Sequence, residues 1–321
     1  MPLIMNIHRL VFGPVPSRRL GLSLGVDPIP PKTCTMNCVY CECGKTNRLT
    51  STREMFYPPQ QIIDDIETAL REGPRPDYIT FAGSGEPTLY LGLGEVVAYL
   101  KKNHSEFKLA LITNSTLLDD PQVIQETLGF DVVLPSLDAA TQSTFLRVTR
   151  PVRGITADHM IEALANYRCL FLGPIWLEIF IVPGLNDGQE ELQAFLSALK
   201  KINPHRIQVN SLDRPGTEKW VQVPPRKELF EIKKLFASTG IPVDVVCRGG
   251  DFESHGPLLA PDKVKMLLEE WLKRRPATMG DLKRVTGYSE EELQVILKEW
   301  QKEKQVEIRQ DSNNLFYCWR S

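Results

Sequence analysis

Short apolar runs alternate with amphipathic stretches through most of the chain. Strand–helix alternation with short connections predicts βαβ units around a parallel sheet, whose reactive residues are expected at the carboxyl ends of the strands. The apolar runs that predict strands are Leu22–Val26, Tyr78–Ala82, Leu109–Thr113, Val132–Leu137, Ile175–Val182, Ile207–Asn210 and Val243–Cys247. The stretches that predict helices between them are Pro59–Arg71, Leu93–Lys101, Pro121–Leu128, Thr156–Cys169, Glu190–Lys200 and Arg226–Ser238.

The pattern changes after residue 250. A turn-rich segment there predicts a linker over residues 251–260, between a core of residues 1–250 and a small domain of residues 261–321. The order of three helices followed by a hairpin in this domain is that of a winged helix-turn-helix. Its predicted elements are Asp262–Arg275, Thr278–Val285 and Ser289–Lys304, then Val306–Arg309 and Leu315–Trp319 around the turn Asp311–Asn314.

Two predicted helices begin with capping-box spacing, in which an oxygen-bearing side chain is followed three residues later by glutamate. Asp187 with Glu190 marks a helix of the core, and Ser289 with Glu292 marks the third helix of the C-terminal domain.

Composition is that of an ordinary globular protein, with 42% hydrophobic and 24% charged residues in 321, and a formal net charge of −2. This charge indicates neither a nucleic-acid nor a membrane-surface partner. No apolar run reaches the roughly 18 residues that a membrane span requires, and the N-terminal residues do not follow a signal-peptide pattern. We therefore expect a cytoplasmic protein.

Four of the seven cysteines lie within ten positions, which favours metal ligation over a disulfide framework. Cys34, Cys38 and Cys41 form a C-x3-C-x2-C pattern. Three thiolates on one loop can hold three irons of a [4Fe–4S] cubane and leave the fourth iron to another ligand. Zinc is the alternative, but zinc usually takes a second cysteine or histidine pair, which this loop lacks. We interpret Cys43 as incidental.

A small-residue turn follows the second predicted strand. Gly83, Ser84 and Gly85 lead into Glu86 and Pro87. Glycine lets a backbone approach a ligand closely, so this turn is suited to bind one.

The cysteine spacing, with aromatic Tyr40 directly before Cys41, resembles the signature of the radical S-adenosylmethionine (radical SAM) superfamily, and the Gly-Glu-Pro turn resembles its second signature. The resemblance implies a partial (β/α)6 TIM-like barrel, here with the small α+β winged-helix domain appended. It also implies an enzyme that reductively cleaves S-adenosylmethionine at the cluster, so that a 5′-deoxyadenosyl radical abstracts hydrogen from a substrate. A ferredoxin or flavodoxin would supply the electron.

The same resemblance assigns strand-end residues to S-adenosylmethionine, although ordinary turn and capping chemistry is the alternative for each polar one. By position they are Gly83, Gly85 and Glu86 for the amino group; Asn114, Ser136 and Asp138 for the polar half; Arg150 for the carboxylate; and Tyr40, Val182 and Asn210 near the adenine.

Upstream, the run Gly13–Gly21 resembles the opening of a radical SAM subgroup related to wyosine-synthesising tRNA enzymes, a likeness that spans roughly residues 9 to 250. Arg18 and Arg19 of this run are candidates to bind a substrate phosphate or carboxylate. The alternative is solvated or helix-paired arginines.

Several substrate classes stay open. RNA-base modification follows from the wyosine likeness, but those enzymes carry further cysteines before the radical SAM loop, and Cys34 is the first cysteine here. A peptide or protein docked by the C-terminal domain is the second candidate, and a small molecule is a third. A non-enzymatic iron–sulfur sensor with a winged-helix output is the alternative to an enzyme.

The charge of the C-terminal domain argues against duplex DNA. Residues 261–321 hold 12 Lys and Arg against 11 Asp and Glu, a net of +1, whereas nucleic-acid footprints are strongly basic. The recognition helix would open with Glu290, Glu291 and Glu292, which would face phosphates. We interpret Trp271, Trp300 and Trp319 as core residues rather than base-stacking ones.

Overall fold

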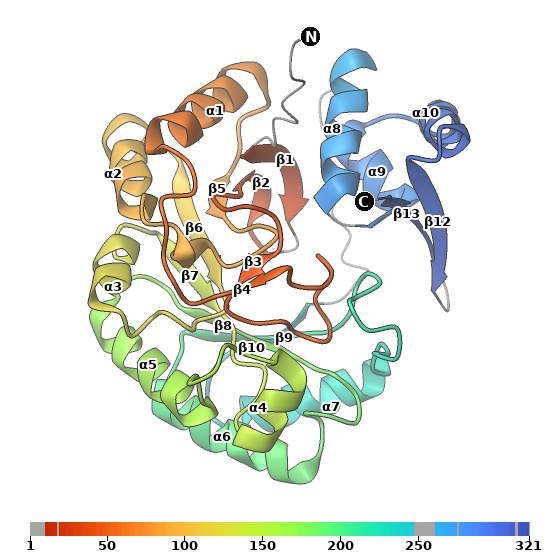
Figure 1. Ribbon diagram of the computed structural model, residues 1–321. Helices are drawn as coiled ribbons and strands as arrows, with labels where there is room; N and C mark the ends of the chain where they lie inside the picture. Colours follow the sequence, from red (N-terminus) through yellow and green to blue (C-terminus); the bar gives the residue numbers. More distant parts are fainter. Residues whose placement is uncertain (1–9, 18, 247–260, 275, 312–313, 321) are drawn as a thin grey trace.

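The centre of the molecule is an arc of mostly parallel strands with helices on its outer side (Figure 1). The structure, a computed structural model, describes residues 10–17, 19–246, 261–274, 276–311 and 314–320. The predicted linker, Arg18 and Cys247 lie outside the described residues. A five-stranded sheet in the order β1-β2-β5-β6-β7 adjoins a three-stranded sheet in the order β10-β9-β8. Isolated parallel bridges from Val133 to Ile175 and from Ser136 to Glu178 join β7 to β8 and make the arc continuous.

The parallel strands are β2 (Gly21–Val26), β5 (Tyr78–Phe81), β6 (Lys108–Thr113), β7 (Val132–Pro135), β8 (Trp176–Phe180), β9 (Arg206–Asn210) and β10 (Val243–Val246). The helices are α1 (Pro59–Glu72), α2 (Leu93–Asn103), α3 (Pro121–Thr127), α4 (Gln142–Thr149), α5 (Ala157–Leu170), α6 (Gln189–Ile202) and α7 (Arg226–Ala237). In the described chain, six strand–helix units from β2 to α7 are thus followed by the further strand β10. The predicted mixed α/β fold and its predicted strands are confirmed.

The two faces of the arc carry different side chains, because alternate residues of a strand point to opposite faces. On β8, Leu177 and Ile179 belong to the main apolar core, which also includes Phe195 of α6. Trp176, which precedes Leu177 and points to the opposite face, packs instead with Leu134 of β7 in a separate cluster on the inner face. The sheet is therefore apolar toward its helices and mixed toward its interior.

Strand β1 (Val11–Ser17) pairs antiparallel with β2 at one edge of the arc. The sequence pattern predicted no strand here, only a segment that precedes the first strand, because Pro14 and Pro16 interrupt the apolar residues. Proline is tolerated in an edge strand, where a missing N–H breaks no ladder. Val15 of β1 packs against Trp271 and Val285, so the C-terminal helices cover this edge.

The C-terminal unit has its own core of helix and sheet residues. Its elements are α8 (Pro261–Arg274), β11 (Ala277–Thr278), α9 (Met279–Thr286), α10 (Glu290–Lys302), β12 (Val306–Asp311) and β13 (Asn314–Trp319), with the strands in the order β11-β13-β12. These bounds agree with the predicted helices and hairpin. Trp271 and Trp300 are each 6% exposed, and Trp300 meets Trp319 edge to face, which confirms their interpretation as core residues.

One of the two predicted capping boxes is present. Ser289 and Glu292 cap α10 reciprocally, whereas α6 begins at Gly188 without a side-chain cap. The prediction for Asp187 is wrong because its carboxylate accepts the N–H of Gly184, at 2.8 and 2.9 Å, and so tightens the preceding turn. None of the described helices is long and apolar enough to cross a bilayer.

Candidate functional site

The cysteine loop follows β2, beyond the carboxyl end of that strand, and its backbone is held on both sides. The N–H of Asn37 donates to the carbonyl of Thr149 at 3.0 Å, and that of Val39 donates to Val148 at 3.0 Å. Within the loop, the Asn37 carboxamide accepts the N–H of Thr46 at 3.0 Å. The short strand β3 (Thr33–Cys34), which pairs with β4 (Arg48–Leu49), starts the loop. The cysteines are therefore carried on a backbone that its neighbours fix in place.

The three motif cysteines are free and half-buried. Burial raises the pKa of Cys34 to about 12, and burial raises the pKa of Cys38 well above its ordinary value, helped by the nearby Cys34 and Asp138. Among the described residues, no three His, Cys, Asp or Glu side chains form a ready-made metal site. Instead, Cys34 lies near Cys38, and Cys41 contacts Cys43. Both thiols with raised pKa would lose their protons on binding iron, since the thiolate is the ligand.

Cys43, which was interpreted from the sequence as incidental, lies inside this site. Its Sγ is 3.8 Å from the carbonyl oxygen of Gly83, and a hydrogen bond to Cys41 is the first cause of its raised pKa. The C-x-C spacing from Cys41 was the only sequence signal for it.

The Gly83–Gly85 turn packs its backbone against the start of the cysteine loop. A Cβ on Gly85 would lie 1.9 Å from the carbonyl oxygen of Thr33, and one on Gly83 would lie 2.0 Å from the Asp27 carboxylate. Both positions therefore require glycine. The N–H of Glu86 donates to that same Thr33 carbonyl at 3.1 Å. The two sequence motifs are thus joined directly, main chain to main chain.

Glu86 is 1% exposed, and its carboxylate is fully engaged. One oxygen accepts the hydroxyls of Thr88 at 2.6 Å and Thr113 at 2.7 Å, and the other accepts the N–H of Asn114 at 2.7 Å. Burial raises the pKa of Glu86, while these hydrogen bonds oppose the rise. The side chain ties the turn η1 (Pro87–Leu89) to the end of β6.

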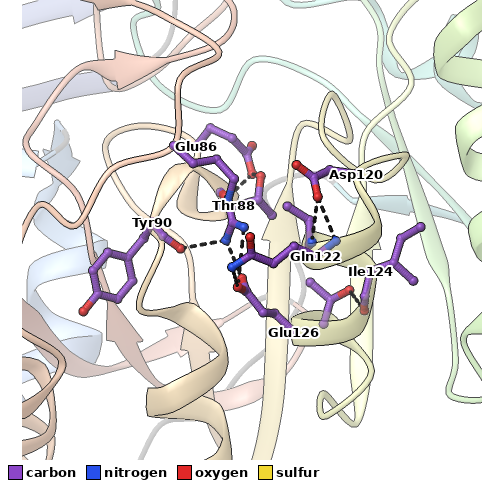
Figure 2. Close-up of polar contacts among 10 residues, drawn as sticks. Glu86, Thr88, Tyr90, Asp120, Gln122, Ile124 and Glu126 are labelled. Carbon is purple, nitrogen blue, oxygen red and sulfur yellow. Dashed lines mark hydrogen bonds and ion pairs between the residues drawn. The ribbon is translucent and has the colours of Figure 1, made fainter.

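A second set of bonds supports this turn, and Figure 2 shows Thr88, Tyr90 and Glu126, the residues that these bonds join. The Arg53 guanidinium donates to the carbonyls of Thr88, at 2.9 Å, and Tyr90, at 3.0 Å, and pairs with Glu126 of α3. Figure 2 shows Gln122 beside Glu126, one helical turn away. Because Arg53 and Glu126 are nearly buried, the turn rests on an ion pair shielded from water.

Asn114 connects the end of β6 to the cysteine loop. Its amide nitrogen donates to the hydroxyl of Thr35 at 2.7 Å and to the sulfur of Cys34 at 3.4 Å. Its amide oxygen accepts the hydroxyl of Thr116 at 2.7 Å, which fixes the side chain. Hydrogen bonds to cysteine sulfur are one means by which a protein adjusts an iron–sulfur centre.

The family model of the radical SAM superfamily matches residues 29–196, just over half of the chain, and this span contains the cysteine loop, the glycine turn and Asn114. The chain belongs to the radical SAM superfamily. As a radical SAM protein it is an enzyme, and its cofactors are a [4Fe–4S] cluster and S-adenosylmethionine.

Two curated relatives are similar over most of this radical SAM chain. A protein of Brachyspira hyodysenteriae named GTPase Obg is 37% identical over 76% of the chain, which spans only 37% of that protein. The UPF0026 protein MJ1312 of Methanocaldococcus jannaschii is 33% identical over 71% of this chain and 71% of its own length. Among solved structures, a radical SAM methyltransferase from Sphaerobacter thermophilus matches with a TM-score of 0.55 and 19% identity, over 73% of this chain and 69% of that one. At this identity the last match shows the fold alone.

The residues present fit the radical SAM cofactors. Three free thiols on a held loop are the ligands that an iron–sulfur cluster takes. Beside them, the Gly83–Gly85 turn has room for backbone only, and the Asn114 amide already contacts the Cys34 sulfur. The structure thus places the start of the cysteine loop beside Gly83, Gly85, Glu86 and Asn114.

A second group of predicted residues lies around Tyr40. Its ring stacks on Phe180 at 4.0 Å between centroids, and its hydroxyl donates to the carboxylate of Asp138. Asp138 also accepts the N–H of Phe180 at 2.7 Å, and burial raises its pKa to about 6. Val182 belongs to the same apolar cluster as Tyr40. Tyr40 and Val182 are therefore neighbours, as predicted, whereas Asp138, which was predicted to lie at the polar half of S-adenosylmethionine, contacts Tyr40 instead.

Asn210 is 8% exposed and Gln208 is 4% exposed, on the inner face of β9. Within the described residues, neither side-chain oxygen has a hydrogen-bond partner. Glu178 lies opposite Gln208 in the register of β8 and β9. The inner face near the strand ends is thus polar.

The remaining predicted residues have protein partners or lie elsewhere. Arg150 pairs with Glu218 at the surface, and Ser136 accepts the hydroxyl of Ser115 through its carbonyl at 2.9 Å. Arg19 pairs with Glu178 of β8, an interior partner rather than solvent or a helix.

Sequence reasoning missed a set of hydrogen bonds that hold the cysteine loop to the segment after β9. Glu42, next to Cys41, accepts the N–H groups of Asp213 at 2.9 Å and Arg214 at 3.0 Å. The hydroxyl of Thr217 donates to the Cys41 carbonyl at 3.1 Å. Arg214 is 6% exposed and lies 3.7 Å from the carboxylate of Asp281 on α9. No local pattern could reveal contacts between segments more than 170 positions apart.

Proposed function

We propose that this enzyme reductively cleaves S-adenosylmethionine at a [4Fe–4S] cluster held by Cys34, Cys38 and Cys41. When bound, the cluster and S-adenosylmethionine together supply a 5′-deoxyadenosyl radical, which abstracts hydrogen from a substrate. The observation that carries the proposal is the direct joining of the cysteine loop to the Gly83–Glu86 turn, with Gly85 against the Thr33 carbonyl.

The chain's own residues would act mainly by positioning. Asn114 would orient Cys34 and donate to its sulfur, as it does in the structure. The glycine turn would offer backbone carbonyls to the amino group of S-adenosylmethionine, because no side chain intervenes. Tyr40 would help to form the adenine side, where its stacking on Phe180 and its bond to Asp138 hold it still.

The test is anaerobic reconstitution with iron and sulfide, followed by reduction with dithionite and a search for 5′-deoxyadenosine. We expect the wild type to bind the cluster and form this product. Cys38→Ser should lose both properties, whereas the matched control Cys169→Ser should keep them, because Cys169 is exposed on α5. A fully reconstituted, reduced wild type that leaves S-adenosylmethionine intact would contradict the proposal.

We further propose that residues 261–321 form a winged-helix-like domain that docks a peptide or protein substrate. Its support is the first turn of α10, where Glu290, Glu291 and Glu292 would repel nucleic-acid phosphates. The tRNA-base modification suggested by the Gly13–Gly21 run is the competing reading. A gel shift of the full-length protein with total tRNA and with duplex DNA distinguishes them, and tight tRNA binding would favour base modification.

A further inference from the structure

Three segments meet at the surface, and the cysteine loop is one of them. The segment after α4 runs along the loop, since the N–H of Val152 donates to the carbonyl of Thr35 at 2.8 Å. On the other side, the N–H of Glu218 donates to the carbonyl of Val39 at 3.1 Å. In Figure 1 the loop, the end of α4 and the segment after β9 lie together. Whatever binds across these segments is held next to the cysteines.

These segments present cations. We name as the cationic face five exposed side chains: Lys45, Arg147, Arg150, Arg153 and Lys219. In the part of the chain that the structure describes, Arg150 pairs with Glu218, and no ion pair involves the other four. Glu42, the nearest acid along the loop, is turned toward Arg214. The face is therefore positive, although the whole chain has a net charge of −2.

Trp220 lies in the same segment, next to Lys219, and is 50% exposed. A large aromatic side chain among arginines is typical of the energetic centre of a protein–protein interface. An exposed tryptophan beside Lys219 suits a partner with an apolar spot next to acidic groups.

We propose that the cationic face docks an acidic one-electron carrier protein, which reduces the cluster from this side. The inference rests on the proposed function. One electron leaves the carrier, which is oxidised by one electron, and enters the cluster, which is reduced by one electron; no bond forms or breaks. Charge complementarity steers such encounters and raises their rate at low salt.

The position of the face favours a carrier over an RNA. A carrier needs only to bring its redox centre close to the cysteine loop, which the face surrounds. An RNA substrate must instead present a base to the interior of the strand arc. Five cations are also fewer than the roughly 6 to 10 phosphate contacts of a salt-sensitive nucleic-acid binder.

The experiment measures the rate at which a reduced, acidic flavodoxin bleaches the visible absorbance of the reconstituted cluster. The variants are Arg147→Glu with Arg153→Glu, Lys45→Glu with Lys219→Glu, and Trp220→Ala. The matched control reverses Lys200 and Lys234, exposed residues in the last turns of α6 and α7. Those helix ends lie at the opposite edge of the sheet, where the strands begin.

We expect each double reversal on the cationic face to slow reduction by flavodoxin about tenfold or more at low salt. Salt should slow the wild type and erase the difference, because exposed charges are screened within about 10 Å at 0.1 M. Iron content and reduction by dithionite, a small reductant, should be unchanged, which shows that the variants are folded. The control reversals should behave as wild type.

Equal rates in wild type and reversed variants would overturn the docking proposal. So would a wild-type cluster that dithionite reduces but that neither flavodoxin nor an acidic ferredoxin reduces. Tight tRNA binding that the same reversals abolish, with carrier rates unaffected, would assign the face to RNA instead. Failure to form 5′-deoxyadenosine with dithionite would contradict the proposed function. The rates of cluster reduction by flavodoxin would still test the docking proposal separately.

Discussion

The surroundings of Glu86 and the inner face of β9 are both buried and polar, yet they differ in how their polar atoms are satisfied. Glu86 accepts the hydroxyls of Thr88 and Thr113 and the N–H of Asn114, each at 2.7 Å or less, and the N–H of Thr88 at 3.1 Å. On β9, the side-chain oxygens of Gln208 and Asn210 have no partner among the described residues.

This difference distinguishes a region that holds the backbone in place, around Glu86, from a surface that can bind a ligand, on β9. Buried polar groups are normally paired, so a satisfied network fixes backbone, whereas an unsatisfied one is available to a ligand or to water. The Glu86 region therefore holds the cysteine loop and the glycine turn in register before any cofactor binds. The inner face of β9 instead carries two buried amide oxygens, of Gln208 and Asn210, that have no partner among the described residues.

The largest effect is expected from Glu86→Ala. It leaves two hydroxyls and the N–H groups of Thr88 and Asn114 without their buried acceptor, so we expect the free energy of unfolding to fall by about 3 kcal/mol or more. Urea unfolding of the cofactor-free protein measures this. Glu86→Gln, which keeps one carbonyl acceptor, should lose roughly half as much. Equal losses in both variants would show that volume, rather than hydrogen bonding, matters at this position.

Gly85→Ala should destabilise by about 1 to 3 kcal/mol, because the new methyl group meets the Thr33 carbonyl and over-packs the joint between the two motifs. Iron uptake on reconstitution should fall with it, since Thr33 precedes Cys34. Gly188→Ala is the matched control, because its Cβ would meet open space. Normal iron content in Gly85→Ala would argue that the loop can move without losing the cluster.

A smaller effect is expected from Tyr40→Phe. The stacking on Phe180 is kept and only the bond to Asp138 is lost, so the free energy of unfolding should fall by about 1 to 2 kcal/mol. Affinity for S-adenosylmethionine, measured by anaerobic equilibrium dialysis, should fall if this pair shapes the adenine side. Phe130→Leu, a change in the helix-facing core, serves as the control, with lower stability but unchanged affinity.

The strands and the two motifs could be predicted because their signals are local. Val132–Pro135 is a continuous apolar run, and it is buried at all four positions. The cysteine spacing and the Gly-Glu-Pro turn are short motifs whose meaning does not depend on distant partners. Val182 and Asp138 could be placed at one edge of the parallel sheet because both follow strands, but the contact of Asp138 with Tyr40 was not predicted.

The rest depended on partners far away in the sequence. Glu42 meets Arg214 at a separation of 172 positions, and Arg19 meets Glu178 across the sheet interior. Asp187 has the spacing of a helix cap, but its carboxylate accepts the N–H of Gly184 in the turn before the helix. The sequence offers each of these charged side chains several possible partners. Tertiary packing decides which partner lies close enough to bind.

The sharpest test of the comparison pairs two buried asparagines. Asn186 is fully engaged, since it accepts the N–H of Val182 at 2.7 Å and donates to the carbonyls of Phe180 and Asp138 at 2.6 and 2.8 Å. Asn210 has an unpartnered oxygen. Asn186→Leu should therefore destabilise by about 2 kcal/mol or more, whereas Asn210→Leu should change stability by no more than about 0.5 kcal/mol. Asn210→Leu should nevertheless weaken binding of S-adenosylmethionine, because its amide is then lost to the ligand. If both variants destabilise equally, β9 is part of the framework, and the division between a fixed joint and a receptive interior does not hold.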